Sequence, residues 1–140
     1  MYILTIETTG KLSSVSVVDG EGRIVGVKTS LDFMSHLKNI VPMISDLLEE
    51  TGVKKQQLTH IAAAIGPGSF TGIRIGVSTA RALCQSLDLP AVAVPTLDSF
   101  LYKKEALEKR PEDVVCAVIN ARRGQVYGMI DGYMKPQPCM

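Results

Sequence analysis

The period of the hydrophobic pattern changes near residue 30, and this change constrains the fold more than any other feature of the sequence. Before it, the segments 2–6, 13–18 and 23–28 are apolar or alternate between apolar and polar residues, and GK and DGEG turn signals separate them. Alternation with a period of two indicates strands, and short turns between strands favour antiparallel pairing. This part of the chain therefore predicts a three-stranded antiparallel meander.

A helical period begins near Met34 and ends near Gly52, which supplies a stop signal. Pro42 lies inside this helix, where it removes one backbone hydrogen bond and is expected to bend the axis. The apolar residues that recur at the spacing of one helix face are Leu37, Ile40, Val41, Ile44, Leu47 and Leu48.

Strands then alternate with helices along the chain. The pattern predicts strands at 60–65 and 91–94 and helices at 71–87 and 96–107, the last opening with a threonine or aspartate cap. Strands that alternate with helices pair in parallel. The whole order predicts an α/β fold with a mixed five-stranded sheet flanked by helices, which is the topology of the ribonuclease-H-like half of actin-like (ASKHA) ATPases.

A second unit is expected to begin after Pro111. The segments 114–120 and 125–130 have the composition of two further strands, and about ten residues follow them. We therefore expect a ribonuclease-H-like N-terminal domain at 1–110 and the start of an incomplete, truncated second lobe at 111–140.

Charge and cysteine content exclude several classes of protein. The formal net charge is +1 and the basic pairs are scattered, so strong independent binding to nucleic acid is not expected. Cys84, Cys116 and Cys139 are odd in number and lack CxxC spacing, which favours neither a disulfide framework nor a zinc site. Without a leader-like N-terminus or an apolar run of membrane-spanning length, we expect a soluble cytoplasmic protein with no membrane partner.

The sequence GPGSFTGIRIG at 66–76 joins a predicted strand to a predicted helix. A glycine-rich turn before a helix can present free backbone N–H groups to a phosphate. However, Gly72 is not followed by Lys-Ser/Thr, and the three-glycine dinucleotide fingerprint is absent, so neither nucleotide motif is satisfied. The alternative, which the residue types favour, is that the glycines only turn the chain and let the helix approach the sheet.

The helix at 71–87 is apolar or small on more sides than one sheet can cover. Gly72 and Gly76 leave room for another backbone to come close, and Met34 and Met43 widen the apolar arc of the first helix. The polar residues form one narrow wedge: Arg74, Ser78, Arg81, Gln85 and Asp88.

These two helices therefore predict an interface with a second copy or with a different protein. The alternative is a core that the C-terminal unit fills from the other side. The predicted interface residues are Met34, His36, Leu37, Val41, Met43, Gly72, Arg74, Ile75, Gly76, Thr79, Ala80 and Leu83.

Four segments together resemble the TsaB (YeaZ) family. In the order of the family they are Glu7-Thr8-Thr9, Ser35-His36 with Pro42, GPGSFTGIRIG at 66–76, and NARRGQVY at 120–127, and the resemblance covers essentially the whole chain. Two features depart from the family pattern. Glu7 and Asn120 stand where members usually have aspartate, and members usually complete a second lobe that this chain only starts.

The resemblance implies a non-catalytic subunit with no active site and no cofactor of its own. In the family, this subunit pairs through its first two helices with TsaD, the ATPase-fold subunit that transfers threonylcarbamoyl to adenosine 37 of tRNA. TsaE, a small P-loop ATPase, joins the pair. ATP and metal are thus expected on the partner subunits, tRNA is contacted only indirectly, and a homodimer through the same two helices is an alternative assembly.

The competing hypothesis is an actin-fold ATPase or phosphotransferase that uses the loop at 66–76. In actin-like ATPases the acid at the end of the first strand helps to hold metal and nucleotide, and here that position is Glu7. A third hypothesis is a homodimeric structural module without another partner. Under the enzyme hypothesis the anion-binding or nucleotide-binding residues are Glu7, Thr8, Thr9, Gly66, Gly68, Ser69 and Thr71.

Metal and nucleophile chemistry are not predicted. His36 and His60 are the only histidines, and their separation gives no HExxH or HxxxH pattern. Ser69 lacks the GxSxG elbow, so we expect it to cap the helix or to bond within the turn. Arg122 and Arg123 are expected at a solvated strand end, with phosphate or RNA contact in an assembled complex as the alternative.

Overall fold

The computed structural model describes residues 1–30, 36–102, 114–131 and 137–139. Its first part is a five-stranded sheet of order β3-β2-β1-β4-β5, in which β1 pairs antiparallel with β2 and parallel with β4. This mixed sheet confirms the predicted fold class. The elements, in chain order, are β1 (Tyr2–Glu7), β2 (Ser13–Asp19), β3 (Ile24–Ser30), α1 (His36–Thr51), the 3-10 helix η1 (Lys55–Gln57), β4 (Leu58–Gly66), α2 (Phe70–Leu87), β5 (Ala91–Pro95) and α3 (Thr96–Leu101).

The turn between β2 and β3 is organised by Asp19. Its Oδ1 accepts hydrogen bonds from the backbone N–H of Glu21 at 2.9 Å and of Arg23 at 3.0 Å. Its Oδ2 accepts from Arg23 Nε at 2.8 Å, and Gly22 supplies a φ of +82°. Hydrogen bonds from the backbone and then the side chain of Arg23 hold the pKa of the Asp19 carboxyl below its ordinary value.

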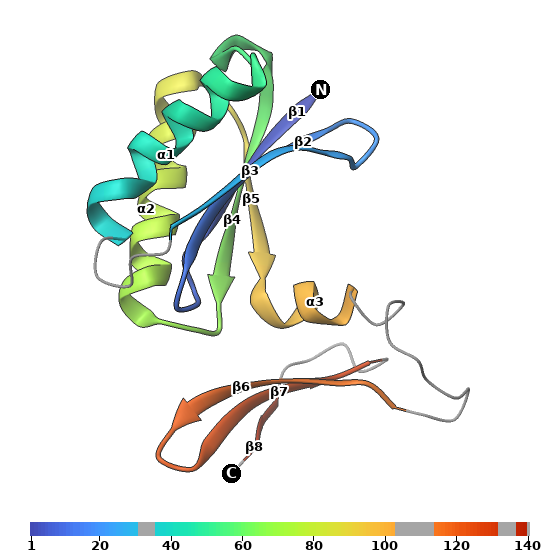
Figure 1. The fold of residues 1–140 in the computed structure, drawn as a ribbon. Helices are drawn as coiled ribbons and strands as arrows, with labels where there is room; N and C mark the ends of the chain where they lie inside the picture. Colours follow the sequence, from blue (N-terminus) through green and yellow to red (C-terminus); the bar gives the residue numbers. More distant parts are fainter. Residues whose placement is uncertain (31–35, 103–113, 132–136, 140) are drawn as a thin grey trace.

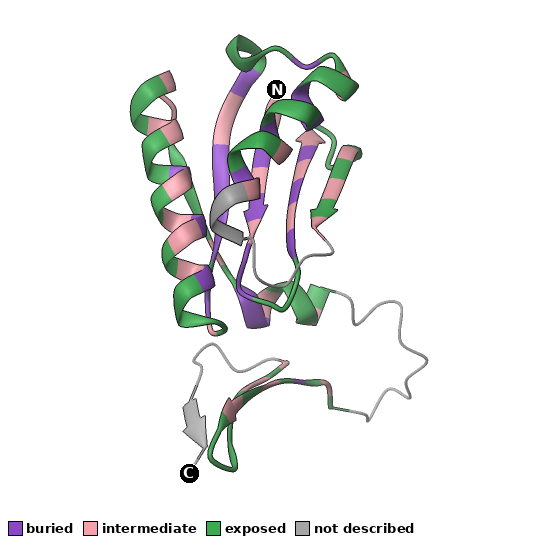
Figure 2. Cartoon of the chain, turned by 60° about the vertical axis from the view of Figure 1, so that its left-hand side comes forward, coloured by how far each residue is buried: buried purple, intermediate pink, exposed green. Residues whose placement is uncertain are grey.

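The core lies between the sheet and one helical layer. Helices α1 and α2 lie side by side on the same face of the sheet (Figure 1). The inward residues of β1 and β2 pair across the ladder, Leu4 with Val17 and Ile6 with Val15. Figure 2 shows buried residues concentrated in the central strands and on the helix sides turned toward them, whereas the edge strand β3 is mostly exposed.

Helix α1 comes close to the edge strand at Gly26. A Cβ at this position would lie 2.5 Å from Thr51 Cγ2 and 3.0 Å from Leu47 Cδ1. The Thr51 hydroxyl donates to the carbonyl O of Leu47 at 2.7 Å, which orders the last turn of the helix. Gly52, with a φ of +68°, follows the helix as predicted.

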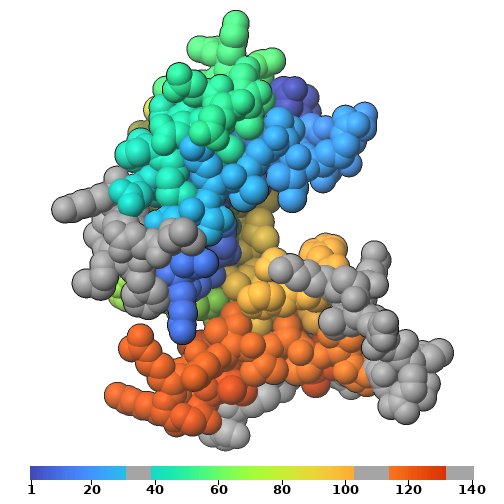
Figure 3. Space-filling view, viewed as in Figure 1, coloured from blue at the N-terminus to red at the C-terminus, as the bar shows by residue number. Residues whose placement is uncertain are grey.

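A second sheet of three strands follows, in the order β6-β7-β8. Its strands are β6 (Cys116–Arg122), β7 (Gln125–Ile130) and β8 (Gln137–Cys139). The hairpin of β6 and β7 confirms the two predicted strands, and α3 packs against both of them (Figure 3). The predicted boundary between residues 110 and 111 lies outside the described residues, so the division into two domains stays a prediction.

Three short features differ from expectation. Helix α3 has Pro95 as its N-cap without a side-chain hydrogen bond, so the predicted threonine or aspartate cap is wrong. The physical reason is that the Thr96 hydroxyl turns inward and donates to Thr9 Oγ1 at 3.3 Å. The sequence did not predict η1 and β8, because three-residue elements carry no measurable period. The predicted continuation of α3 to residue 107 lies outside the described part of the chain.

Candidate functional site

The two segments predicted for anion or nucleotide binding meet at one junction, where β1 ends and the β4–α2 turn begins. The Ser69 N–H donates to the carbonyl O of Thr9 at 2.7 Å, which ties the turn to the chain that follows β1. Gly66 has a φ of +101°, and the Gly66–Pro67 peptide bond is cis. The structure thus brings residues 7–9 and 66–69 together.

The side chains at this junction bond to one another. The backbone N–H and the hydroxyl of Thr9 both donate to Glu7 Oε1, at 2.5 and 2.6 Å. Thr8 Oγ1 donates to the carbonyl O of Gly72 at 2.7 Å, and Thr96 Oγ1 donates to Thr9 Oγ1. Within the described residues, every buried side-chain nitrogen and oxygen has a partner. A network satisfied in this way leaves no buried polar side chain that requires a ligand.

The start of α2 is closed by the chain itself. Ser69 is the N-cap and its Oγ accepts from the Gly72 N–H at 3.2 Å, which confirms the predicted capping role. A Cβ on Gly68 would lie 2.5 Å from the carbonyl O of Thr9, and a Cβ on Gly72 would collide with the carbonyl O of Thr8. The protein backbone therefore fills the space beside these glycines. This occupancy concerns the side of each glycine on which a Cβ would stand, and nucleotide binding by the turn stays a prediction.

The glycines of α2 correct one sequence-based interpretation. We expected Gly72 and Gly76 to admit the backbone of a partner, but both are buried against Thr8 of the same chain. A Cβ on Gly76 would collide with Thr8 Oγ1 and lie 3.6 Å from Ile6 Cγ2. Ala80 completes this buried stripe. These three residues pack inside the chain because α2 crosses the end of β1 at short distance.

A groove between α1 and α2 holds the exposed part of the predicted interface. Its volume is about 400 Å³. Val41 on its α1 side is 58% exposed, although it is apolar. Thr71, predicted as a possible anion-binding or nucleotide-binding residue, lines this groove. The lining residues are Ile40, Val41, Thr71, Arg74, Ile75, Ser78 and Thr79.

The other predicted interface residues are placed differently. Met43 and Leu83 are partly buried and pack against the core, as does Ile75 from the floor of the groove. His36 and Leu37 belong to α1, whereas Met34 lies outside the described residues. The structure therefore gathers four predicted residues at one accessible surface: Val41, Arg74, Ile75 and Thr79.

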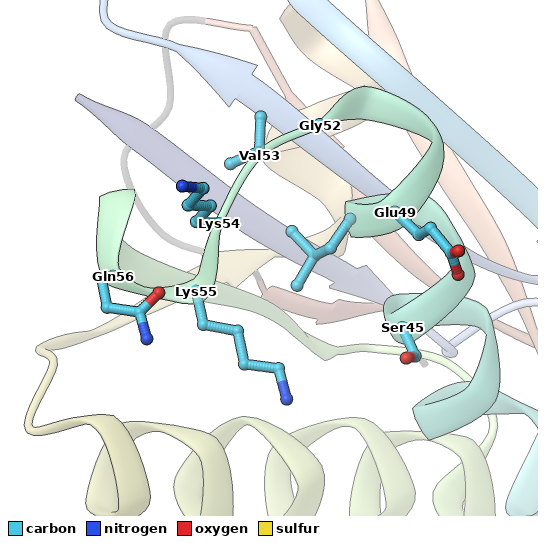
Figure 4. A pocket seen from close by; sticks show the side chains of 8 residues that line it. Ser45, Glu49, Gly52, Val53, Lys54, Lys55 and Gln56 are labelled. Atoms are coloured by element: carbon cyan, nitrogen blue, oxygen red, sulfur yellow. The ribbon is translucent and has the colours of Figure 1, made fainter.

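A second depression lies at the C-terminal end of α1 (Figure 4). Its volume is also about 400 Å³. Lys54 and Lys55 extend in different directions from the loop, so they do not converge on one point (Figure 4). No predicted site residue is among those that line it: Ser45, Leu48, Glu49, Gly52, Val53, Lys54, Lys55 and Gln56.

Two observations concern metal-binding and thiol groups in the described residues. They contain no group of three or more His, Cys, Asp and Glu side chains that could hold a metal ion. Burial raises the pKa of the Cys84 thiol, which favours the protonated, unreactive form. Over the same described ranges, no helix is both long and apolar enough to cross a membrane.

Known proteins are similar to this chain in sequence and in fold. The tRNA threonylcarbamoyladenosine biosynthesis protein TsaB of Escherichia coli is 36% identical over 128 residues, and that of Bacillus subtilis is 34% identical over 127 residues; each match covers 91% of this chain. The chain belongs to the TsaB (YeaZ) family. YeaZ from Pseudomonas aeruginosa superposes with a TM-score of 0.77 at 30% identity, covering 99% of this chain and 64% of that chain.

The chain is also similar to TsaD proteins. The family described as "TsaD: tRNA N6-adenosine threonylcarbamoyltransferase" matches residues 21–137 of this chain. The Lmo2764 protein from Listeria monocytogenes, described as an N-acetylmannosamine kinase, has a TM-score of 0.57 at 18% identity, which shows a shared fold alone. The chain spans about half the length of the TsaB relatives, 53% of the E. coli and B. subtilis proteins.

The sequence did not anticipate the roles of Thr8 and Thr96 in the junction. Both hydroxyls are buried and donate across the junction, at 64 and 87 residues of separation in sequence. The sequence signal for this contact is the pair Gly72 and Gly76 at helical spacing. The pair indicates that another part of a protein comes close to the helix, but it does not identify that part. A buried threonine at the end of the central strand was that neighbour.

Proposed function

We propose that this chain is a non-catalytic partner subunit that binds and stabilises a TsaD-like protein in the synthesis of tRNA threonylcarbamoyladenosine. The observation that carries the proposal is the groove between α1 and α2, which is accessible and partly apolar. The glycines of the 66–76 turn, in contrast, pack against residues 8 and 9 of the same chain. A groove of this kind suits helix packing against another protein. The names of the TsaB relatives supply the pathway.

The proposal includes a division of labour. The chain needs no cofactor of its own, and ATP and metal belong to the partner subunits. A TsaE-like P-loop ATPase joins the assembly, tRNA is contacted only indirectly, and self-association through the same two helices competes with partner binding. The start of α2 supports this assignment because the Gly72 N–H already donates to Ser69 Oγ, and residues 8 and 9 pack against Gly68 and Gly72.

The test is complex formation with a purified TsaD-family protein, measured by size-exclusion chromatography with light scattering and by calorimetry. Val41→Glu should abolish the complex, because it places a charge on the apolar wall of the groove. Val27→Glu on β3 is the matched control, since Val27 is 60% exposed and Val41 is 58% exposed. Absence of a wild-type complex, or equal loss in both variants, would refute the proposal.

The enzyme hypothesis has its own measurement. An ATPase or phosphotransferase that uses the 66–76 loop requires measurable nucleotide affinity, so calorimetric titration with Mg-ATP should show heat of binding. We expect no binding, since the backbone of residues 8 and 9 occupies the space beside the glycines. Saturable binding that Ser69→Ala or Gly68→Ala weakens would favour the enzyme hypothesis.

A further inference from the structure

Strand β3 forms one edge of the five-stranded sheet and is largely exposed (Figure 2). Among the described residues it pairs only with β2, so no strand lies along its other side. Ile24 is 68% exposed, Val25 is 39% exposed and Val27 is 60% exposed. β-Branched residues of this kind favour strand pairing. The edge therefore has the composition of an inner strand, although nothing in the described part of the chain covers it.

The only charged residue of β3, Lys28, does not protect this edge. Proteins commonly keep edge strands from pairing by placing a charged side chain there, most often lysine. Here Lys28 Nζ donates to Glu50 Oε1 at 2.6 Å and lies 3.9 Å from Asp46 Oδ2, and both carboxylates belong to α1. These contacts hold the lysine on the helix side of the sheet. The open side of β3 thus has no charge that would repel another strand.

The opposite edge of the same sheet, β5, is built differently. It is only five residues long and ends at Pro95, which has no backbone N–H to donate. Short edge strands and prolines are two of the features by which proteins prevent pairing between edges. The two edges of the sheet therefore differ, since β5 has such protection and β3 lacks it.

Two copies of β3 complement each other when they run antiparallel about a two-fold axis at Val27. In this register Val27 lies opposite Val27 of the second copy, and apolar β-branched pairs of this kind stabilise a sheet. Lys28 lies opposite Gly26 of the second copy, so lysine does not face lysine, and the glycine leaves room for its stem. The register shift of β3 against β2 falls before Gly26, so the central part of the strand is regular.

We propose that β3 pairs with β3 of a second copy, antiparallel about a two-fold axis at Val27, and so joins the two sheets into one continuous sheet. This inference goes beyond the proposed function. It leaves the groove between α1 and α2 open, because no residue that lines the groove belongs to β3. Two edge strands bury less than the roughly 1,200 Å² of a stable interface, so we expect a weak dimer with a dissociation constant on the order of 10–100 µM.

The experiment is sedimentation velocity from about 1 to about 500 µM with wild type, Val27→Glu, Val27→Lys and Val92→Glu. Val92→Glu is the matched control, since Val92 is an exposed valine on the other edge strand. Wild type and control should dimerise equally. Val27→Glu and Val27→Lys should each weaken the dimer by at least about 30-fold, because like charges then face each other at the axis. An equimolar mixture of these two variants should recover the dimer, because glutamate then faces lysine.

The recovery in the mixture identifies the occupant, because only a second copy meets itself at position 27. A wild type that stays monomeric over this range overturns the proposal, as does a dimer that Val27→Glu leaves intact. Loss of the dimer in both charge variants without recovery in their mixture overturns the two-fold pairing at Val27. Equal weakening by Val92→Glu also overturns the proposal, because the loss then comes from net charge alone.

Hydrogen exchange of the wild type gives a second measurement that needs no variant. Backbone amides of β3 should exchange more slowly at about 500 µM than at about 1 µM, whereas those of β5 should not change. Equal exchange of β3 at both concentrations overturns the proposal. Circular dichroism checks that each variant is folded. Failure of this pairing leaves the proposed function standing, since that function is tested with a different protein at the groove between α1 and α2.

Discussion

Replacing Gly72 by alanine tests the contact that fixes α2 on the sheet. In an unconstrained helix this change is favourable by about 1 kcal/mol, because alanine has the higher helix propensity. Here the added methyl would collide with the carbonyl O of Thr8, which is main chain and cannot rotate away. Helix α2 must move outward, and the hydrogen bond from Thr8 Oγ1 to the carbonyl O of Gly72, 2.7 Å long, is lost with it.

The magnitude follows from three contributions. Overpacking against main chain costs about 3 kcal/mol, the upper end of the usual range. The lost buried hydrogen bond costs about 1 kcal/mol more, and the gain in helix propensity offsets about 1 kcal/mol. We therefore expect Gly72→Ala to lower the free energy of unfolding by about 3 kcal/mol, which moves a urea midpoint by about 1.5 M at a slope of about 2 kcal/mol/M.

Gly76→Ala provides an internal comparison. Its obstacle is the side-chain Oγ1 of Thr8, which a truncation can remove. In a Thr8→Ala background, Gly76→Ala should become nearly neutral or stabilising, whereas Gly72→Ala should stay destabilising. Ser78→Ala, on the exposed side of the same helix, should change the free energy of unfolding by less than about 0.5 kcal/mol.

The assay is urea unfolding followed by far-ultraviolet circular dichroism, with all variants measured at one pH and one temperature. A Gly72→Ala midpoint equal to or above that of the wild type would refute the close packing of α2 on residue 8. Loss of stability in Gly76→Ala that Thr8→Ala fails to relieve would refute the hydroxyl as its cause.

Three further predictions concern the junction, the first hairpin and the cysteines. Thr96→Val should lower the free energy of unfolding by about 1 kcal/mol, because valine is similar in size to threonine but lacks the buried hydroxyl that donates to Thr9. An unchanged urea midpoint would contradict this. The pKa of the Asp19 carboxyl is lowered in the fold. Its stabilisation of the turn should therefore be complete above about pH 4 and should be lost as the pH falls through the lowered pKa. The chemical shift of the Arg23 amide should follow this transition in the wild type and should stay constant in Asp19→Asn. Cys84 should alkylate with iodoacetamide more slowly than exposed Cys116, because burial raises the pKa of the Cys84 thiol, and equal rates by peptide mass spectrometry would contradict the burial.

The strands and long helices could be predicted because their signals are local. Ile6 lies between Thr5 and Glu7, and its cross-strand partner Val15 lies between Ser14 and Ser16, so alternation indicates the buried face at this pair. The parallel pairing of β4 and β5 followed from the helix between them. These features require no knowledge of distant contacts.

The orientation of α2 could not be obtained in the same way. This helix is small or apolar on several sides, so the period does not decide whether Gly72 or Ile75 turns toward the sheet. The structure assigns Gly72 to β1 and Ile75 to the groove, because the buried threonine at position 8 leaves room only for a residue without a side chain. Thr96 shows the same limit of local patterns. Its hydroxyl donates to Thr9, 87 residues away in sequence, and does not cap its own helix.

Because Gly72 packs against Thr8, two nearby positions of α2 should be under different kinds of selection: one for folding and the other for partner binding. At position 72 the fold itself favours glycine, so a library randomised there and screened for stable folding should be enriched in the wild-type residue. Position 74 lies two residues further on and faces outward, so the same screen should accept many side chains and narrow to arginine only when partner binding is selected. If both positions prove invariant among relatives, the cause would be packing inside the protein at position 72 and contact with another molecule at position 74.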